Sequence, residues 1–139
     1  MAAERALLDT SVLVAFLHAD DQDHEVAVDA IRGFQGTLLA TEAILTESMH
    51  LLGRTVGGPA ACLTFFLRGG AMVVPSSRSS LARCRSLLEE YRDLPADFGD
   101  ATLVALAEET ETWTVLTLDR RDFSVYRGED GQAFDVRPY

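Results

Sequence analysis

Five acidic residues interrupt apolar sequence in this chain: Asp9, Glu47, Asp97, Asp100 and Asp119. Two of them follow apolar runs of strand length, two open an apolar stretch of helical length, and one lies on an apolar helix face. Two like charges about 4 Å apart repel by about 4 kcal/mol at an effective dielectric constant near 20, so converging carboxylates require a cation. Hard divalent cations prefer oxygen ligands. The pattern therefore predicts a metal site and metal-dependent chemistry.

Asp9 is followed by Thr10 and Ser11, and all three residue types cap helices well. A capping role for Asp9 is thus the simpler alternative. Because Thr10 or Ser11 can cap the following helix instead, we expect the Asp9 carboxylate to face a functional site.

Glu47 shares its helix face with three apolar residues, Ala43, Ile44 and Leu51. An unpaired carboxylate is costly on a buried face, so the position favours a functional role. The alternative is a glutamate at the edge of the apolar face that extends into water.

The three remaining acids have ordinary explanations when each is taken alone. Asp97 suits the N-cap of the helix 98–110, and Asp100 suits its first turn, where the helix dipole favours negative charge. Asp119 suits a turn before Arg120 and Arg121, two arginines that are either solvated or in contact with phosphate beside a metal site. The five acids together are a stronger indication of function than any one of them.

Apolar runs bounded by turn residues alternate with helical patterns, which is typical of an α/β domain with a mainly parallel sheet. We expect strands over residues 5–8, 37–40, 71–74, 113–118 and 134–137. We expect helices over residues 11–18, 24–34, 42–52, 59–67, 81–92 and 98–110, with Pro95 breaking the chain before the last of them. Ligands of such sheets bind beyond the carboxyl ends of the strands. If the first and fourth strands are neighbours, Asp9 and Asp119 therefore face one crevice, whereas the position of the 98–110 helix relative to them stays open.

Composition restricts the classes of function. The chain has 139 residues, enough for one domain over 1–139, and a net charge of −10 with 12 arginines and no lysine. P-loop and phosphorelay receiver domains need a lysine and are disfavoured. The acidic balance argues against broad nucleic-acid binding and favours a basic protein partner. Cys62 and Cys84 are expected to be reduced, packed thiols, and the lack of a signal peptide or membrane-length apolar run favours a cytoplasmic protein without a membrane partner.

In these features the chain resembles a PIN-domain ribonuclease of the VapC toxin kind, found in type II toxin–antitoxin modules. Four segments carry the resemblance, residues 8–17, 41–47, 97–108 and 116–123, and each contains at least one of the five acids. Each segment is weakly diagnostic alone, but their order and spacing are specific, and they span nearly the whole chain.

The resemblance implies site residues one by one. The family's catalytic acids correspond to Asp9, Glu47, Asp100 and Asp119. Metal ligands are expected among Asp9, Asp97, Asp100 and Asp119, and it stays open whether Asp97 or Asp100 contacts the metal. Substrate contacts are expected from two groups of residues, the hydroxyls of Thr10, Ser11 and Thr117 and the guanidinium groups of Arg120 and Arg121.

The resemblance also implies a fold and partners. It predicts a single PIN-like domain with a parallel sheet of strand order 3-2-1-4-5 and helices on both faces. It further predicts Mg²⁺ or Mn²⁺ as cofactor, RNA as substrate, a homodimer, and an antitoxin that covers the active site. The nearly contiguous apolar residues Leu63, Phe65, Phe66 and Leu67 agree with a dimer interface.

Three alternatives remain beside a ribonuclease toxin. The first is a non-catalytic binding module whose acids hold a basic partner, and the second is a PIN nuclease with a housekeeping role in RNA processing. The third is a metal phosphohydrolase of small phosphate esters. Phosphatases of the haloacid-dehalogenase kind need a second aspartate two residues after the first, where this chain has Ser11.

Overall fold

Five parallel strands form one sheet in the order β3-β2-β1-β4-β5, as predicted. The computed structural model describes residues 4–94 and 96–138, so that Pro95 lies outside the described residues. The strands are β1 Glu4–Leu8, β2 Gly36–Thr41, β3 Met72–Val74, β4 Thr114–Leu116 and β5 Asp135–Arg137. In the register of β1 with β4, Leu8 pairs with Leu116, which places the residues after both strands at the same edge.

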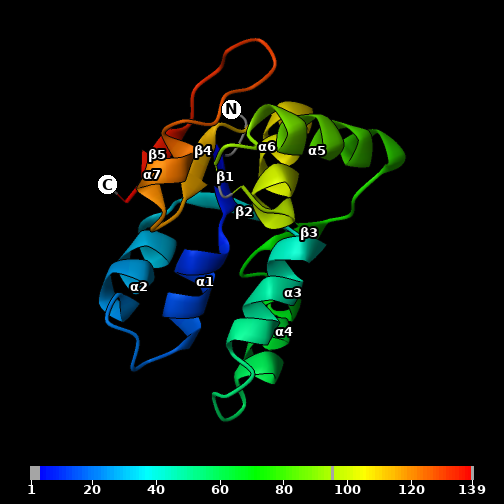
Figure 1. The fold of residues 1–139 in the computed structure, drawn as a ribbon. Helices are drawn as coiled ribbons and strands as arrows, with labels where there is room; N and C mark the ends of the chain where they lie inside the picture. The colour runs from blue at the N-terminus through cyan, green and yellow to red at the C-terminus, as the bar shows by residue number, and fades with distance from the viewer. Residues whose placement is uncertain (1–3, 95, 139) are drawn as a thin grey trace.

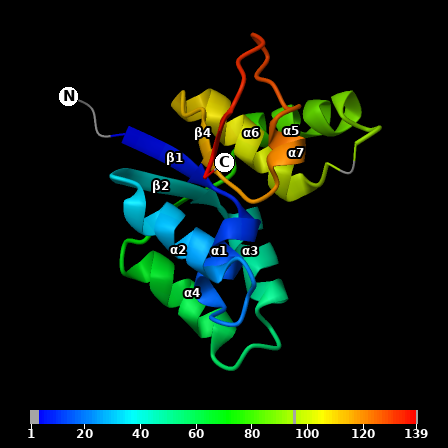
Figure 2. The same ribbon diagram turned by 90° about the vertical axis from the view of Figure 1, so that its left-hand side faces the viewer.

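Helices cover both faces of this sheet (Figure 1). They are α1 Thr10–Leu17, α2 His24–Gly33, α3 Glu42–Leu51, α4 Gly58–Leu67, α5 Arg78–Glu90, α6 Phe98–Thr110 and α7 Arg120–Phe123. Helices α1 to α4 lie on one face and α5 and α6 on the other, as Figure 2 shows. This separation follows from right-handed crossovers, because the chain moves from β1 to β3 in one direction and returns across the sheet to β4.

The core lies on both sides of β1 and around α6. Ala6, Leu7 and Leu8 are fully buried, as expected for a central parallel strand covered on both faces. Residues 101–107 of α6 are all buried, which explains why this helix is apolar around its whole circumference. The helix that opens with Asp97 and Asp100 is therefore fixed firmly in the core.

The structure differs most from the sequence-based expectation at two element boundaries and in one short helix. Helix α5 begins at Arg78 rather than at residue 81, because Ser77 and Ser80 form a reciprocal capping box. The fourth strand ends at Leu116 rather than at residue 118, and the short helix α7 was not predicted. Within the described part of the chain, no helix combines the length and the apolar character that a bilayer crossing requires.

Candidate active site

The site lies where β1 and β4 end side by side. The backbone N–H of Asp9 donates to the carbonyl of Leu116 at 3.0 Å, so the first residue after β1 is fixed to the last residue of β4. The N-terminal turn of α6 lies at the same edge, close enough that the charge of Asp9 raises the pKa of Asp100. The structure thus brings together Asp9, Asp100 and Asp119, and it decides the position of α6 that the sequence left open.

Hydroxyl groups hold the Asp9 carboxylate in place. Its Oδ2 accepts hydrogen bonds from Thr117 at 2.7 Å and from Ser11 at 3.2 Å. The Thr117 hydroxyl also accepts from the backbone N–H of Asp119 at 2.9 Å, and the Ser11 hydroxyl accepts from the backbone N–H of Leu118 at 2.9 Å. This network joins the ends of both strands, so the orientation of Asp9 is set by the fold itself.

Burial makes the charge of Asp9 costly. The residue is 5% exposed, and this desolvation, together with the charge of Asp119, raises its pKa from 3.8 to about 6 although the hydroxyl groups act in the opposite direction. Ser11 and Thr117 therefore stabilise the carboxylate only in part. The folded site holds negative charge that its own hydrogen-bond donors do not fully compensate.

Asp100 is bound by a residue that the sequence analysis did not identify. The phenol of Tyr126 donates to Asp100 Oδ2 at 2.8 Å, and the Tyr126 ring is buried against Phe123 and Tyr91. Burial and the charge of Asp9 raise the pKa of Asp100 to about 8, despite this hydrogen bond. Burial and the adjoining Asp100 also raise the pKa of Tyr126, so the phenol stays protonated as a donor.

Asp97 and Asp119 both cap helices. Asp97 is the N-cap of α6, with Oδ1 accepting from the backbone N–H of Asp100 at 2.9 Å, as the sequence analysis predicted. Asp119 is the N-cap of α7, and its Oδ1 accepts from the N–H of Asp122 at 3.3 Å. Burial and Asp119 raise the pKa of Asp122, a further acid of the site that the sequence analysis treated only as part of a turn.

Glu47 does not lie on a buried stripe, and this expectation was wrong. The buried residues of α3 are Ile44 and Ser48, followed by Leu52, whereas Leu51 is 56% exposed. Glu47 is half-buried at the edge of this face. It faces Gly99 on α6, since a Cβ built on that glycine would lie 3.8 Å from Glu47 Oε2 and 3.4 Å from Asp97 Oδ1. Glu47 therefore borders the site beside Asp97.

The other predicted substrate contacts fall into two groups. Thr10 and Thr117 are buried, and Thr10 Oγ1 has no hydrogen-bond partner in the described part of the molecule. Thr117 is accordingly placed to orient Asp9 rather than to reach a substrate, and Ser11 is bonded to the same carboxylate. Arg120 and Arg121 are exposed on α7, directly beyond Asp119.

The donor set suits a hard divalent cation. Burial raises the pKa of both the Asp9 and the Asp100 carboxyl groups, and the negative charge of Asp9 raises the pKa of Asp100 further. A bound cation would lower both pKa values. Among the residues that the structure describes, no three His, Cys, Asp or Glu side chains form a complete metal-binding group. Mg²⁺ commonly binds through one or two carboxylates and keeps several waters. The residues therefore fit such an ion held by two of the acids.

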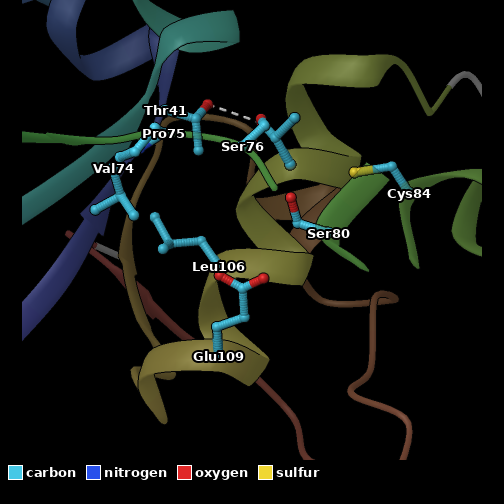
Figure 3. Close-up of a pocket in the computed structure, with 9 residues that line it drawn as sticks. Thr41, Val74, Pro75, Ser76, Ser80, Cys84, Leu106 and Glu109 are labelled. Atoms are coloured by element: carbon cyan, nitrogen blue, oxygen red, sulfur yellow. Dashed lines mark hydrogen bonds between the residues drawn. The ribbon is translucent and has the colours of Figure 1, made fainter. Parts of the chain in front are cut away.

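A small cavity lies apart from these acids, between β3, α5 and α6 (Figure 3). Its volume is about 10 Å³ and its lining includes Val74, Cys84 and Leu106. The Thr41 and Thr102 hydroxyls beside it are hydrogen-bonded to each other at 2.8 Å. This volume holds about one water molecule, so the cavity is not a substrate site. Cys62 and Cys84 are both buried and free, as predicted.

Comparison with known proteins places this geometry in a family context. The family model described as PIN domain matches residues 6–129. The chain is similar to Ribonuclease VapC26 of Mycobacterium tuberculosis, with 31% identity over 134 residues that cover 95% of this chain and 99% of that protein.

Several solved structures have the same fold at low sequence identity. VapC20 of Mycobacterium tuberculosis, described as a sarcin-ricin loop cleaving toxin, has a TM-score of 0.73 and 20% identity over 79% of this chain and 86% of its own. A toxin–antitoxin complex from Klebsiella pneumoniae has a TM-score of 0.66 and 19% identity, covering 86% and 91%. VapBC2 of Rickettsia felis, bound to a DNA fragment from its promoter, has a TM-score of 0.66 and 14% identity, covering 95% and 98%.

Proposed function

Because this chain belongs to the PIN-domain family and to its VapC ribonucleases, we propose that it is a metal-dependent endoribonuclease. The observation that carries the proposal is the convergence of Asp9, Asp100 and Asp119 at the ends of the neighbouring strands β1 and β4. Family membership supplies the reaction class, and the buried Asp9 with the half-buried Asp100 and Asp119 supplies a site suited to it.

VapC nucleases of the PIN-domain family generally use divalent metal ions, and we propose Mg²⁺ or Mn²⁺ here. Asp9 and Asp100 would hold the ion, with Asp119 beside them. When bound, such an ion lowers the pKa of a water molecule and stabilises charge on a phosphodiester.

The protein's own residues orient this site. Thr117 and Ser11 fix Asp9, and Tyr126 fixes one oxygen of Asp100, so that neither carboxylate has to reorganise when RNA binds. We assign Asp119 the role of positioning or deprotonating the attacking water. Glu47 has an accessory role of the same kind, at the edge of the site beside Asp97.

The biological role that we propose is that of a toxin in a toxin–antitoxin pair. VapC26 is a ribonuclease by name, and two of the structural neighbours are complexes of toxins with antitoxins or of VapBC with DNA. We therefore infer a cognate antitoxin that covers the acidic site, a homodimeric toxin, and a cytoplasmic location where the RNA substrate is found.

Cleavage of total bacterial RNA by the purified protein tests the enzymatic proposal. We expect fragments in the presence of Mg²⁺ or Mn²⁺, none with EDTA, and none from a folded Asp100→Asn variant. If the protein folds and binds metal but leaves RNA intact, the ribonuclease proposal is wrong and a non-catalytic binding module becomes the better explanation.

Expression in a bacterial host tests the toxin proposal separately. Growth should stop on expression of the chain alone and resume when the neighbouring upstream gene product is co-expressed, with both proteins purifying as one complex. Harmless expression of a chain that cleaves RNA in vitro would instead favour a housekeeping role in RNA processing.

A further inference from the structure

Helix α5 and the turn after it form a locally basic surface on an acidic protein. Residues 78–94 contain four arginines, two glutamates and Asp93, a local net charge of +1 in a chain whose net charge is −10. Arg83 forms a salt bridge with Glu108, with 2.8 Å between Nε and Oε1. Arg85 and Arg92 are exposed. A polyanion repelled by most of the molecule would thus find favourable charge along this helix.

These two arginines line an open groove with an apolar floor. The groove has a volume of about 460 Å³ and runs between α5 and the first residue of α6. Leu81 and Leu88 on α5 form one side, and Phe98 forms the other. Leu81 is 49% exposed and Phe98 is 45% exposed, so apolar surface faces solvent in a groove that Arg85, Arg92 and Glu89 also line. Such exposed apolar surface commonly marks a binding site.

Phe98 connects this groove to the acidic site. It directly follows Asp97, the N-cap of α6, and lies two residues before Asp100. Its ring also lines a second, larger groove of about 740 Å³, together with Ala43, Glu47 and Asp97. A chain that contacts Phe98 therefore lies beside Glu47 and Asp97 at the border of the acidic site, and it can continue along the α5 groove past Arg85 and Arg92.

We propose that the groove between α5 and Phe98 binds single-stranded RNA, with one base stacked on the Phe98 ring and the neighbouring phosphates held by Arg85 and Arg92. This inference rests on the proposed ribonuclease function and specifies the path of its substrate. Aromatic rings and arginine planes are the groups on which unstacked RNA bases are held, and arginines bind the phosphates.

The arrangement favours RNA over an acidic segment of a protein partner. The α5 groove combines an exposed aromatic ring with two arginines, and Phe98 also lines the groove that contains Glu47 and Asp97 at the border of the acidic site. Arg85 is paired only loosely with Glu89, at 3.7 Å and with both side chains largely exposed, so a phosphate can replace this partner at little cost.

Binding is measured first in EDTA, where no cleavage occurs. The probe is a fluorescein-labelled, mixed-sequence single-stranded RNA of about 12 nucleotides, within the site sizes of such surfaces. We expect Arg85→Gln combined with Arg92→Gln to raise the Kd at least tenfold and to reduce the salt dependence by about 0.7 per arginine. Phe98→Leu should raise the Kd about tenfold. The matched control Arg32→Gln removes an exposed arginine from α2, on the other face of the sheet, and should leave the Kd unchanged.

A direct test of stacking uses Phe98→Trp, which retains an aromatic ring. We expect near wild-type affinity and quenching of the new indole fluorescence by RNA, beyond any change of the native Trp113 signal. In cleavage assays with Mg²⁺, the arginine variants should raise KM while kcat stays within about twofold, because they leave the carboxylates untouched.

The outcomes separate this inference from the proposed function. Wild-type cleavage with RNA affinity unaffected by all groove variants would overturn the groove assignment alone. Loss of a co-purifying protein partner in these variants, with RNA affinity retained, would overturn it in favour of an acidic peptide. Groove-dependent RNA binding without any metal-dependent cleavage would support the groove and contradict the ribonuclease proposal.

Discussion

At the scale of single residues, the site is organised around the buried carboxylate of Asp9 and the half-buried carboxylate of Asp100, which are held by different groups. Asp9 is held by two hydroxyls that come from its own helix and from the end of β4. Asp100 is held by one phenol. In both cases burial outweighs these hydrogen bonds and raises the pKa, so each carboxylate is oriented but remains short of positive charge.

Replacing Asp9 by Asn should separate function from stability. The amide keeps the side-chain shape and can still accept from Ser11 and Thr117, but it cannot carry charge. We expect cleavage to fall by orders of magnitude. The metal-free free energy of unfolding at neutral pH should hold or rise, by up to about 3 kcal/mol, because each pKa unit corresponds to about 1.4 kcal/mol and folding raises the pKa of Asp9 from 3.8 to about 6.

Denaturant unfolding in EDTA and RNA cleavage in Mg²⁺ measure the two effects. Full activity in a folded Asp9→Asn protein would remove Asp9 from the site.

Tyr126 is a positioning residue that this structure adds to the site. Tyr126→Phe removes the hydrogen bond to Asp100 but keeps the ring contacts with Phe123 and Tyr91. We expect the metal concentration that gives half-maximal cleavage to rise roughly tenfold while the KM for RNA stays unchanged. The free energy of unfolding should fall by about 1 kcal/mol. Metal titration of the cleavage rate measures this effect.

The matched control is Tyr91→Phe, which removes a phenol that accepts from the N–H of Arg127 at 3.0 Å, away from the carboxylates. Equal metal dependence in the two variants would mean that Tyr126 serves packing alone.

At the scale of elements, α6 has two functions that its sequence combines. Its buried residues 101–107 fix the helix in the core, and its first turn presents Asp97 and Asp100 at the sheet edge. The rigidity of the core segment is what holds Asp100 at a constant position relative to Asp9. An active-site acid on such an element is placed more accurately than one on a loop.

The two acids of this turn should respond differently to substitution. Asp97→Ala removes the N-cap hydrogen bond to the N–H of Asp100 and should cost about 0.5–2 kcal/mol of stability, with a smaller loss of activity. Asp100→Asn should abolish metal-dependent cleavage with little loss of stability. Calorimetry and metal titration of both variants distinguish them. Lost metal binding in Asp97→Ala and retained binding in Asp100→Asn would reverse the two assignments.

At the scale of the whole molecule, uncompensated negative charge links metal binding to stability. The pKa values of Asp9 and Asp100 are raised to about 6 and about 8. An acid whose pKa is higher in the folded state stabilises the fold when it is protonated. This contribution is complete below the unfolded pKa near 4 and is lost as pH rises through the folded pKa.

We therefore predict that the Tm in EDTA falls between about pH 4 and pH 8, and that Mg²⁺ restores it most strongly at the alkaline end, where no proton competes for the carboxylates. Calorimetry with and without Mg²⁺ at several pH values measures this. The control is the Asp9→Asn, Asp100→Asn double variant, whose Tm should depend much less on pH and on Mg²⁺. A Tm of the wild-type protein that is insensitive to both would contradict the site.

An exposed apolar patch on α3, α4 and the turn between them supports dimerisation. It consists of Leu51, Val56, Leu63 and Leu67. The predicted members Phe65 and Phe66 pack partly against the core instead, with Phe65 touching the ring of Phe16, which corrects the sequence-based patch. We expect a dimer by light scattering at micromolar concentration, and a monomer for Leu67→Glu because charge at an 86% exposed interface residue opposes association.

The matched control is Val125→Glu, an exposed apolar residue outside this patch, which should remain dimeric. A monomeric wild-type protein would exclude the dimer.

The sequence by itself determined the elements and their order. Apolar runs bounded by turn residues predicted all five strands and six of seven helices in the described chain, because periodicity and capping are local properties. The carboxyl-end positions of Asp9 and Asp119 were readable for the same reason. Helix α7 escaped because a four-residue helix shows no periodicity.

Only the tertiary structure decided which side chains meet. The Asp9 bond to Thr117 spans 108 residues of sequence and the Asp100 bond to Tyr126 spans 26, and neither distance follows from local patterns. The burial of Glu47 was predicted wrongly because the sequence of α3 is compatible with more than one buried face. How α3 packs in the folded protein decides which face is buried, and that face contains Ile44 and Ser48. Site geometry depends on how whole elements pack, since burial and long-range contacts are properties of the assembled core rather than of any segment.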